Sequence, residues 1–212
     1  MKKIFVLLAA AMAFVGCGSK SYVVEGTIEG FEGQVAVMDF NGEMILDLAT
    51  VKDGSFQLEV ENDGSGPQIA TFAINNTPVA PIFLDGNNIK VEGNIYGGLV
   101  ITGTAANDAY VEFTNLSQEF SSTLPEDFDP ENPSPEVMAS IAKLLGEQFE
   151  KNKDNLFGAF MILVGNIPAE TPAQMLEYMD ALNEDIKEYA PVKEMRGFVE
   201  QAILQEELQS AE

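Results

Sequence analysis

Residues 50–61 read Thr-Val-Lys-Asp-Gly-Ser-Phe-Gln-Leu-Glu-Val-Glu, and this stretch decides the fold of the first half of the chain. Apolar and polar residues alternate from Ser55 onwards, which puts Phe56, Leu58 and Val60 on one side. A period of two is that of a β-strand with one buried face. The Asp53-Gly54 pair in front of it is typical of a tight turn, because both residue types tolerate a positive φ. The stretch therefore predicts a β-hairpin.

The same alternation continues on both sides, interrupted by pairs such as Asn41-Gly42, Asp85-Gly86 and Gly97-Gly98. Asn41-Gly42 predicts a two-residue hairpin turn. No helical period separates the strands, so we expect no crossover connections and purely antiparallel sheets. About eight short, evenly spaced strands indicate an antiparallel β-sandwich over residues 22–103. Besides 55–61, we expect strands over residues 22–28, 34–40, 44–51, 69–74, 79–84, 89–95 and 99–102.

The period becomes helical near Thr104, so the fold class is α+β: the β-sandwich is followed by an α-helical region over residues 104–212. Ser134-Pro135 and Thr171-Pro172 are typical helix starts, because each pairs a capping hydroxyl with proline in the first turn. Residues 156–164 are apolar on nearly all sides, which predicts a buried central helix. The helix after Thr171 is expected to continue its apolar face to Ile186, and the last helix to start at Pro191.

The N-terminus predicts a lipid anchor. Met1-Lys2-Lys3 precedes an apolar run over residues 4–15, which at about 1.5 Å per residue is too short to span a bilayer and is typical of a signal peptide over residues 1–16. Phe14-Val15-Gly16-Cys17 resembles a bacterial lipobox, with Phe in place of the usual Leu. The resemblance implies that the Cys17 thiol carries the lipid and that residues 17–21 are a lipidated tether. A plain signal peptide with an incidental cysteine is the alternative.

We therefore expect the chain in the cell envelope, anchored to the outer membrane. No acidic cluster follows Cys17, which favours the periplasmic side over the cell surface.

Composition excludes several functions. The chain has 34 acidic and 11 basic residues, a net charge of −23, one Cys and no His. This charge argues against a nucleic-acid partner, and the missing His excludes His-ligated metals and a His base for a serine nucleophile. Residues 126–131 alternate acidic side chains as a calcium loop does, but Asn132 and Met138 replace its glycine and its bidentate glutamate. We expect no enzyme activity, no cofactor and no metal site, although weak divalent-ion binding at 126–131 stays open.

The acidic residues are unevenly distributed. Residues 17–103 hold 12 acidic and 3 basic residues, whereas residues 104–212 hold 22 and 6. A solvated surface that maintains solubility is one interpretation, and a docking surface for a basic partner is the other.

Several strand and turn motifs together resemble a known domain type. They are Val24-Glu25-Gly26-Thr27-Ile28, the hairpin at 50–56, Pro81–Gly86 with Ile89–Gly93, and Ile101-Thr102-Gly103-Thr104 before Asn107. This pattern resembles the uncharacterised β-sandwich domain that leads many envelope thiol-disulfide oxidoreductases of the AhpC/TSA, thioredoxin-like class. Asn155-Leu156-Phe157-Gly158-Ala159-Phe160 resembles the helix that joins that domain to the redox domain. The resemblance implies the fold, but the sequence has no Cys-x-x-Cys motif, so no redox activity and no catalytic residue carry over.

These observations predict a non-enzymatic, lipid-anchored envelope protein that acts as a binding or scaffold module, with Cys17 as its lipid-attachment residue. The alternative is an accessory subunit whose helical half docks a separate thioredoxin-like oxidoreductase.

Overall fold

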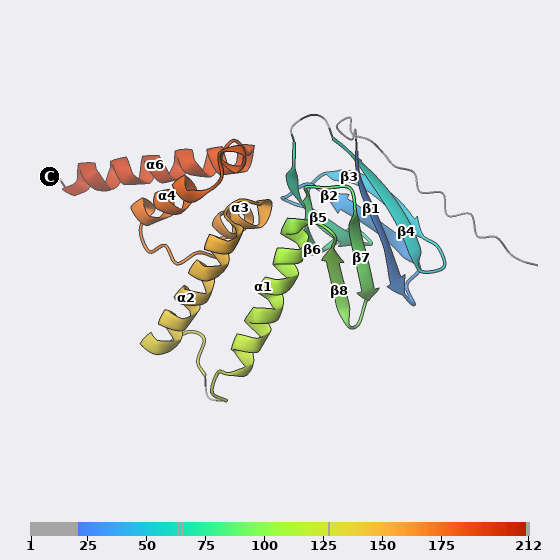
Figure 1. Ribbon diagram of the computed structural model, residues 1–212, viewed down its shortest axis with the longest axis horizontal. Helices are drawn as coiled ribbons and strands as arrows, with labels where there is room; N and C mark the ends of the chain where they lie inside the picture. The colour runs from blue at the N-terminus through green and yellow to red at the C-terminus, as the bar shows by residue number, and fades with distance from the viewer. Residues whose placement is uncertain (1–20, 63, 65, 127, 211–212) are drawn as a thin grey trace, which may run out of the picture.

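The computed structural model describes residues 21–62, 64, 66–126 and 128–210, and it begins with the eight-stranded β structure that the alternation predicts (Figure 1). The strands form two four-stranded sheets, in the orders β4-β1-β7-β8 and β3-β2-β5-β6, which we name the outer sheet and the inner sheet. The strands are β1 Ser21–Glu29, β2 Gly33–Met38, β3 Ile45–Val51, β4 Ser55–Glu61, β5 Gln68–Ile74, β6 Thr77–Leu84, β7 Ile89–Asn94 and β8 Gly98–Thr102.

The sandwich core lies between the two sheets, as the period of two requires. On β4 the side chains of Phe56, Leu58 and Val60 are buried, while the residues between them are exposed. Phe56 of the outer sheet stacks on Phe72 of the inner sheet, with ring centroids 5.8 Å apart. The two sheets are therefore held by a continuous apolar layer, and the predicted α+β fold is confirmed.

One pair of strands contradicts the prediction of purely antiparallel sheets. β1 and β7 are parallel, with Val24 opposite Ile89 and Glu29 opposite Asn94. The argument that parallel strands need a helical crossover was wrong here. The chain leaves the outer sheet after β4, forms β5 and β6 in the inner sheet, and then returns as β7. Between β1 and β7 the chain therefore passes through five strands, four of them in the inner sheet, and these strands make the connection that a helix usually makes.

Only one of the two turns at Asp53-Gly54 and Asn41-Gly42 matches the prediction from the sequence. Asp53 and Gly54 have φ values of 51° and 76°, as the two-residue turn between β3 and β4 requires. At Asn41-Gly42 the expected two-residue turn is replaced by a longer loop, because one carboxylate oxygen of Asp39 accepts hydrogen bonds from the backbone N–H groups of Glu43 and Met44.

The second half of the chain is helical, as predicted. Ser134 and Thr171 cap two of the helices, and Thr171 forms a full capping box with Gln174. The expected continuous helix as far as Ile186 was wrong, since the backbone at Leu182 is extended and a new short helix starts after Asn183. The helices are α1 Ala105–Ser122, α2 Pro135–Asn152, α3 Leu156–Leu163, α4 Pro172–Ala181, α5 Glu184–Lys187 and α6 Ala190–Ser210.

The helices pack on one side of the sandwich, against the inner sheet (Figure 1). Ile69 of β5 and Phe83 of β6 point away from the sandwich core and join the helical core, where α3 is almost wholly buried. The rings of Phe157 and Phe160 meet that of Phe83 edge-to-face. The face of the outer sheet that points away from this core stays exposed, as its outward residues Glu25, Thr27 and Glu92 show.

Two hydrogen-bonded contacts fix the junction between helices and sheet. The side-chain amide of Asn107 on α1 donates to the carbonyl of Phe83 at 2.8 Å and accepts from its N–H at 3.1 Å. The Tyr189 hydroxyl accepts from the N–H of Ile69. Within the described residues, none of the helices is both long and apolar enough to traverse a bilayer.

Candidate functional site: a groove and two hollows along the outer sheet

A groove with a mostly apolar lining lies between β6 and β8. These strands are the free edges of the two sheets, so the sandwich is open between them. The opposite side is closed, because the β3–β4 hairpin links the sheets through the Lys52–Ser55 bridge. The groove encloses about 390 Å³, and its apolar lining is Phe31, Ile74, Val79, Ala80, Ile95 and Leu99. We call it the apolar groove.

An acidic hollow lies next to the groove, on the far side of the loop that joins β1 to β2. It encloses about 690 Å³ and carries the carboxylates of Glu29, Glu32 and Asp53. The Phe31 side chain, only 7% exposed, lines both depressions. A side chain at Gly33 would collide with the Phe31 ring at 2.6 Å, so glycine at that position lets the ring lie flat against the strand. We call this depression the acidic hollow.

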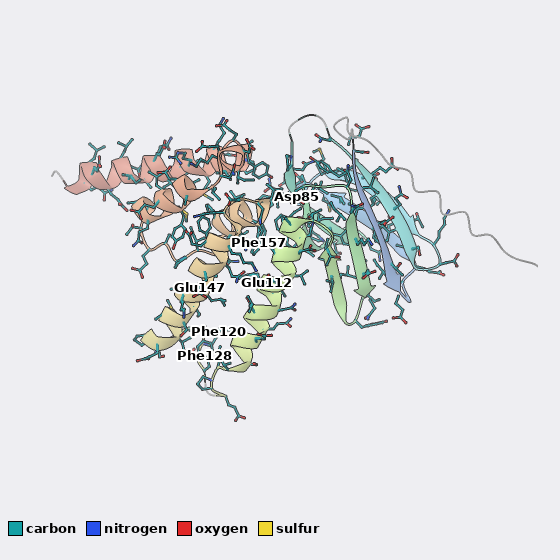
Figure 2. The ribbon with its side chains drawn as sticks, in the orientation of Figure 1. Asp85, Glu112, Phe120, Phe128, Glu147 and Phe157 are labelled. Atoms are coloured by element: carbon teal, nitrogen blue, oxygen red, sulfur yellow. The ribbon has the colours of Figure 1, made fainter. Side chains whose placement is uncertain are left out.

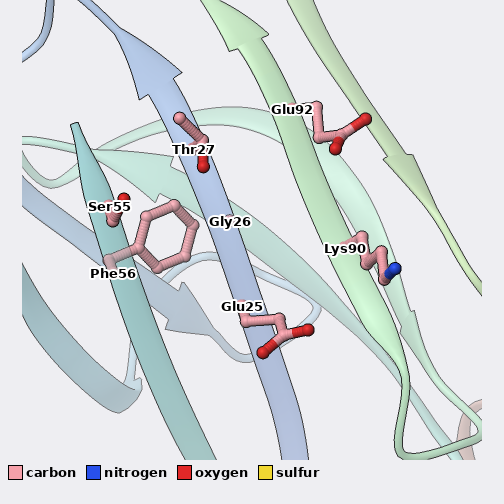
Figure 3. Close-up of a pocket in the computed structure, with 7 residues that line it drawn as sticks. All are labelled: Glu25, Gly26, Thr27, Ser55, Phe56, Lys90 and Glu92. Atoms are coloured by element: carbon pink, nitrogen blue, oxygen red, sulfur yellow. The ribbon is translucent and has the colours of Figure 1, made fainter. Parts of the chain in front are cut away.

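A third depression continues along the exposed face of the outer sheet (Figure 3). It is lined by Glu25, Thr27 and Ser55 with Lys90 and Glu92, and encloses about 310 Å³. Gly26 lies in its floor, with its missing side chain on the core side of the strand. A Cβ there would meet the Val91 carbonyl oxygen at 2.3 Å and the Phe56 ring at 2.9 Å. We call it the sheet hollow.

The three depressions are neighbours on the surface of the sandwich. The apolar groove and the acidic hollow share Phe31, and the acidic hollow and the sheet hollow share Thr27. The surface is apolar at the groove and acidic elsewhere, because its two hollows are lined by five carboxylates and one lysine. We call this surface the binding track.

A carboxylate with a raised pKa lies elsewhere, at the junction between sandwich and helices (Figure 2). Burial raises the pKa of Asp85 above its ordinary value, and hydrogen bonds from Thr104 and the Ala106 N–H only partly offset that rise. One Asp85 oxygen is buried without a hydrogen-bond partner among the described residues. No depression described above includes Asp85, so we assign it to the packing of α1 on the sandwich.

None of the predicted site residues that the structure describes lies in the binding track. Cys17 and the predicted signal peptide and tether up to Lys20 lie outside the described residues. In the loop after α1, Glu126, Asp129 and Glu131 are exposed, and Asp129 accepts a hydrogen bond from the Glu131 N–H. Across the described ranges, no three acidic or thiol side chains are grouped as metal ligands would be.

Sequence reasoning missed the binding track, although one part of its signal was present. Alternation over the predicted strand 22–28 puts Glu25 and Thr27 on one face, which is the face that the structure leaves exposed. The groove itself had no local signal, because it depends on which strands become the free edges of the two sheets.

Comparison with known proteins places the binding track inside a recognised domain. Residues 22–110 match the family model described as Domain of unknown function (DUF4369). The match covers nearly all of the sandwich and the first residues of α1, so every residue of the track lies within it. No curated protein and no solved structure matches the chain. The matched model assigns no activity, and the link to thioredoxin-like proteins stays a prediction.

Proposed function

We propose that this chain is a non-enzymatic, lipid-anchored protein of the cell envelope and that its β-sandwich is a binding module. The apolar groove carries the proposal. Its rim leaves Val79 48% and Ile95 44% exposed to water at an open edge of the sandwich. Exposed apolar surface of this kind is favourably covered by a ligand, at about 25 cal/mol per Å².

The size and lining of the groove support ligand binding. Its volume of about 390 Å³ falls in the range of small-ligand sites, which are mostly apolar with a few polar groups at the edge. Asn75, Thr77 and Asn94 supply those polar groups. The Asn75 amide oxygen is already used, because it accepts a hydrogen bond from the Gln34 N–H and thereby stiffens the wall of the groove.

The anchor rests on the chemistry of Cys17. A thiolate attacks an activated carbon readily, and the resulting thioether is stable. Acyl chains contribute about 0.8 kcal/mol for each buried CH₂, so a multiply acylated cysteine holds a protein on a membrane. The chain has no His, and lipidation would occupy its single Cys, which leaves no strong nucleophile or imidazole base for catalysis.

Binding of a neutral apolar dye tests the groove. The full chain in detergent-free buffer, as the Cys17→Ala variant, should increase Nile red fluorescence, and Val79→Asp should remove at least half of that increase. Leu208→Asp is the matched control, since Leu208 is exposed on α6 far along the chain from the groove. Equal losses from Val79→Asp and Leu208→Asp, or no loss from Val79→Asp, would exclude the groove as the binding surface.

Membrane fractionation tests the anchor. Wild-type chain should sediment with membranes, and Cys17→Ala should appear in the soluble fraction, because the lipid has lost its attachment atom. Ser19→Ala changes a neighbouring small residue and should leave the distribution unchanged. Retention of Cys17→Ala on membranes would disprove the anchor without affecting the groove.

A further inference from the structure

We propose that the binding track takes a short extended peptide in which an apolar side chain lies next to basic residues. The inference rests on the proposed binding function and names its ligand class. The apolar side chain would fill the groove at Phe31 and Leu99, and the basic side chains would lie over the acidic hollow at Glu29, Glu32 and Asp53.

The shape of the track favours an extended chain over a compact ligand. Its depressions follow one another along the sandwich and are joined through Phe31 and Thr27. A compact apolar molecule would occupy the groove and leave the acidic hollow empty. A peptide in extended conformation advances about 3.3 Å per residue and turns every second side chain to the same side, so side chains two residues apart can reach neighbouring depressions.

The charge of the track selects basic residues. The carboxylates of the acidic hollow, on Glu29, Glu32 and Asp53, are all exposed to water in the free protein. They can therefore attract a basic side chain from solution. Lys52 next to Asp53 offsets part of this charge but leaves the hollow negative. A second copy of the chain is disfavoured as the occupant, because each copy carries a net charge of −23.

One of the two edge strands of the groove, β6, favours recognition through side chains. Pro78 and Pro81 lie on β6 and have no N–H to donate, so a peptide cannot continue the inner sheet by regular strand pairing along this edge. Along β6 the peptide would therefore be held by its apolar side chain and its charges rather than by a new row of backbone hydrogen bonds.

Fluorescence anisotropy with three labelled peptides tests the proposal on the full chain in detergent micelles. The probe is Ser-Leu-Phe-Lys-Arg-Lys, and its two controls replace either Leu-Phe by Ser-Ser or all three basic residues by Glu. We expect the probe alone to bind, and its affinity to fall as salt is raised, because the exposed charges are screened.

Paired variants locate the contact. Glu29→Gln with Glu32→Gln should weaken binding roughly three- to tenfold at low salt, as expected for losing two exposed ion pairs. Ile95→Ser should weaken binding at every salt concentration. The matched control is Glu119→Gln with Glu206→Gln, which removes the same charge from exposed positions on α1 and α6 and should change affinity less than twofold.

Other outcomes separate this inference from the proposed function. Equal binding of the basic and acidic peptides would overturn the peptide assignment but keep the groove as a binding surface. An equal loss in the control pair would show that only overall charge matters, and would also overturn it. Self-association of the chain that Ile95→Ser abolishes would place a second copy in the groove. Absence of binding up to millimolar peptide would overturn the inference while leaving the dye and fractionation results unchanged.

Discussion

Gly26 shows how a single missing side chain shapes the core of the sandwich. The position faces into the sandwich, where the Phe56 ring of the neighbouring strand fills the space that a Cβ would need. The neighbouring Val91 carbonyl belongs to the backbone of β7, which pairs with β1 and cannot move alone. The packing of Phe56 against β1 therefore depends on glycine at this position.

Gly26→Ala should destabilise the chain by about 1–3 kcal/mol, because the new methyl group overpacks a position enclosed by backbone and ring. Urea unfolding followed by circular dichroism measures the change. Gly197→Ala is the control, since nothing lies within 4 Å of a Cβ at that helical position. The control should be stabilising by up to about 1 kcal/mol, through helix propensity. Equal stability of wild type and Gly26→Ala would contradict the packing described here.

Asp85 makes stability depend on pH in a direction opposite to that of a salt-bridged carboxylate. Its pKa is raised in the folded state, mainly by burial, so the folded protein holds this proton more tightly than the unfolded chain does. The stabilisation from this tighter proton binding is fully present at pH values below the pKa of Asp85 in the unfolded chain. It is lost as pH rises through the pKa of Asp85 in the folded protein. Asp85→Asn cannot ionise, and its amide oxygen can still accept from the Ala106 N–H.

Asp85→Asn should therefore be more stable than wild type at pH 7, and this advantage should shrink as pH falls towards 4. Free energies of unfolding measured for both chains across that range test the prediction. The difference between the two chains isolates Asp85 from the other carboxylates. A difference that is constant with pH would show that Asp85 titrates alike in the folded and unfolded states.

At the scale of elements, the docking of α1 on the sandwich depends on one buried amide. Asn107 is 1% exposed and satisfies both the N–H and the carbonyl of Phe83. Because β6 is an edge strand, these two backbone groups have no neighbouring strand on that side. The side chain thus completes the edge of the inner sheet and fixes where the helical region begins.

Asn107→Ala should cost about 1–3 kcal/mol of stability, because it leaves two buried backbone groups without partners. Hydrogen exchange should also be faster at the Phe83 amide. Asn115→Ala, at an exposed position of the same helix, should stay within about 0.5 kcal/mol of wild type. Unchanged exchange at Phe83 in Asn107→Ala would show that the amide contact is dispensable.

Local elements were largely predictable from the sequence, because strand and helix periods are local properties. Clean alternation over 55–61 matches β4, and Ser134 and Thr171 start helices as their residue types predict. The loop at Asn41-Gly42 departed from prediction because the Asp39 carboxylate offers two nearby N–H groups a better partner. The parallel pairing of β1 with β7 was not predictable, since it depends on how distant strands divide between the two sheets.

At the scale of the whole molecule, the direction of β1 determines which end of the sandwich faces the membrane if Cys17 carries lipid. Residues 17–20 span at most about 14 Å when extended, so Ser21 must stay near the bilayer. The far end of β1 lies about 30 Å along the strand, and the loop with Phe31 follows it. The acidic hollow and the apolar groove would then point away from the membrane.

Energy transfer from a labelled chain to acceptor lipids in vesicles tests this orientation. A dye at Glu61→Cys, opposite Ser21, should be quenched more than a dye at Tyr96→Cys, in the turn beyond the far end of β7. Inserting ten Gly and Ser residues after Lys20 should reduce the difference, because a longer tether lets the body tumble. Equal quenching at the two sites without the insertion would contradict the orientation.

The central place of β1 has a mechanical consequence. This strand is paired on both sides, with β4 and with β7. Its first residue follows the tether, and its last residue leads to the binding track. A ligand that pulls on the track while the anchor holds would load β1 along its own axis. The hydrogen bonds lie across that axis, so they would share the load together in shear instead of opening one after another like a zipper.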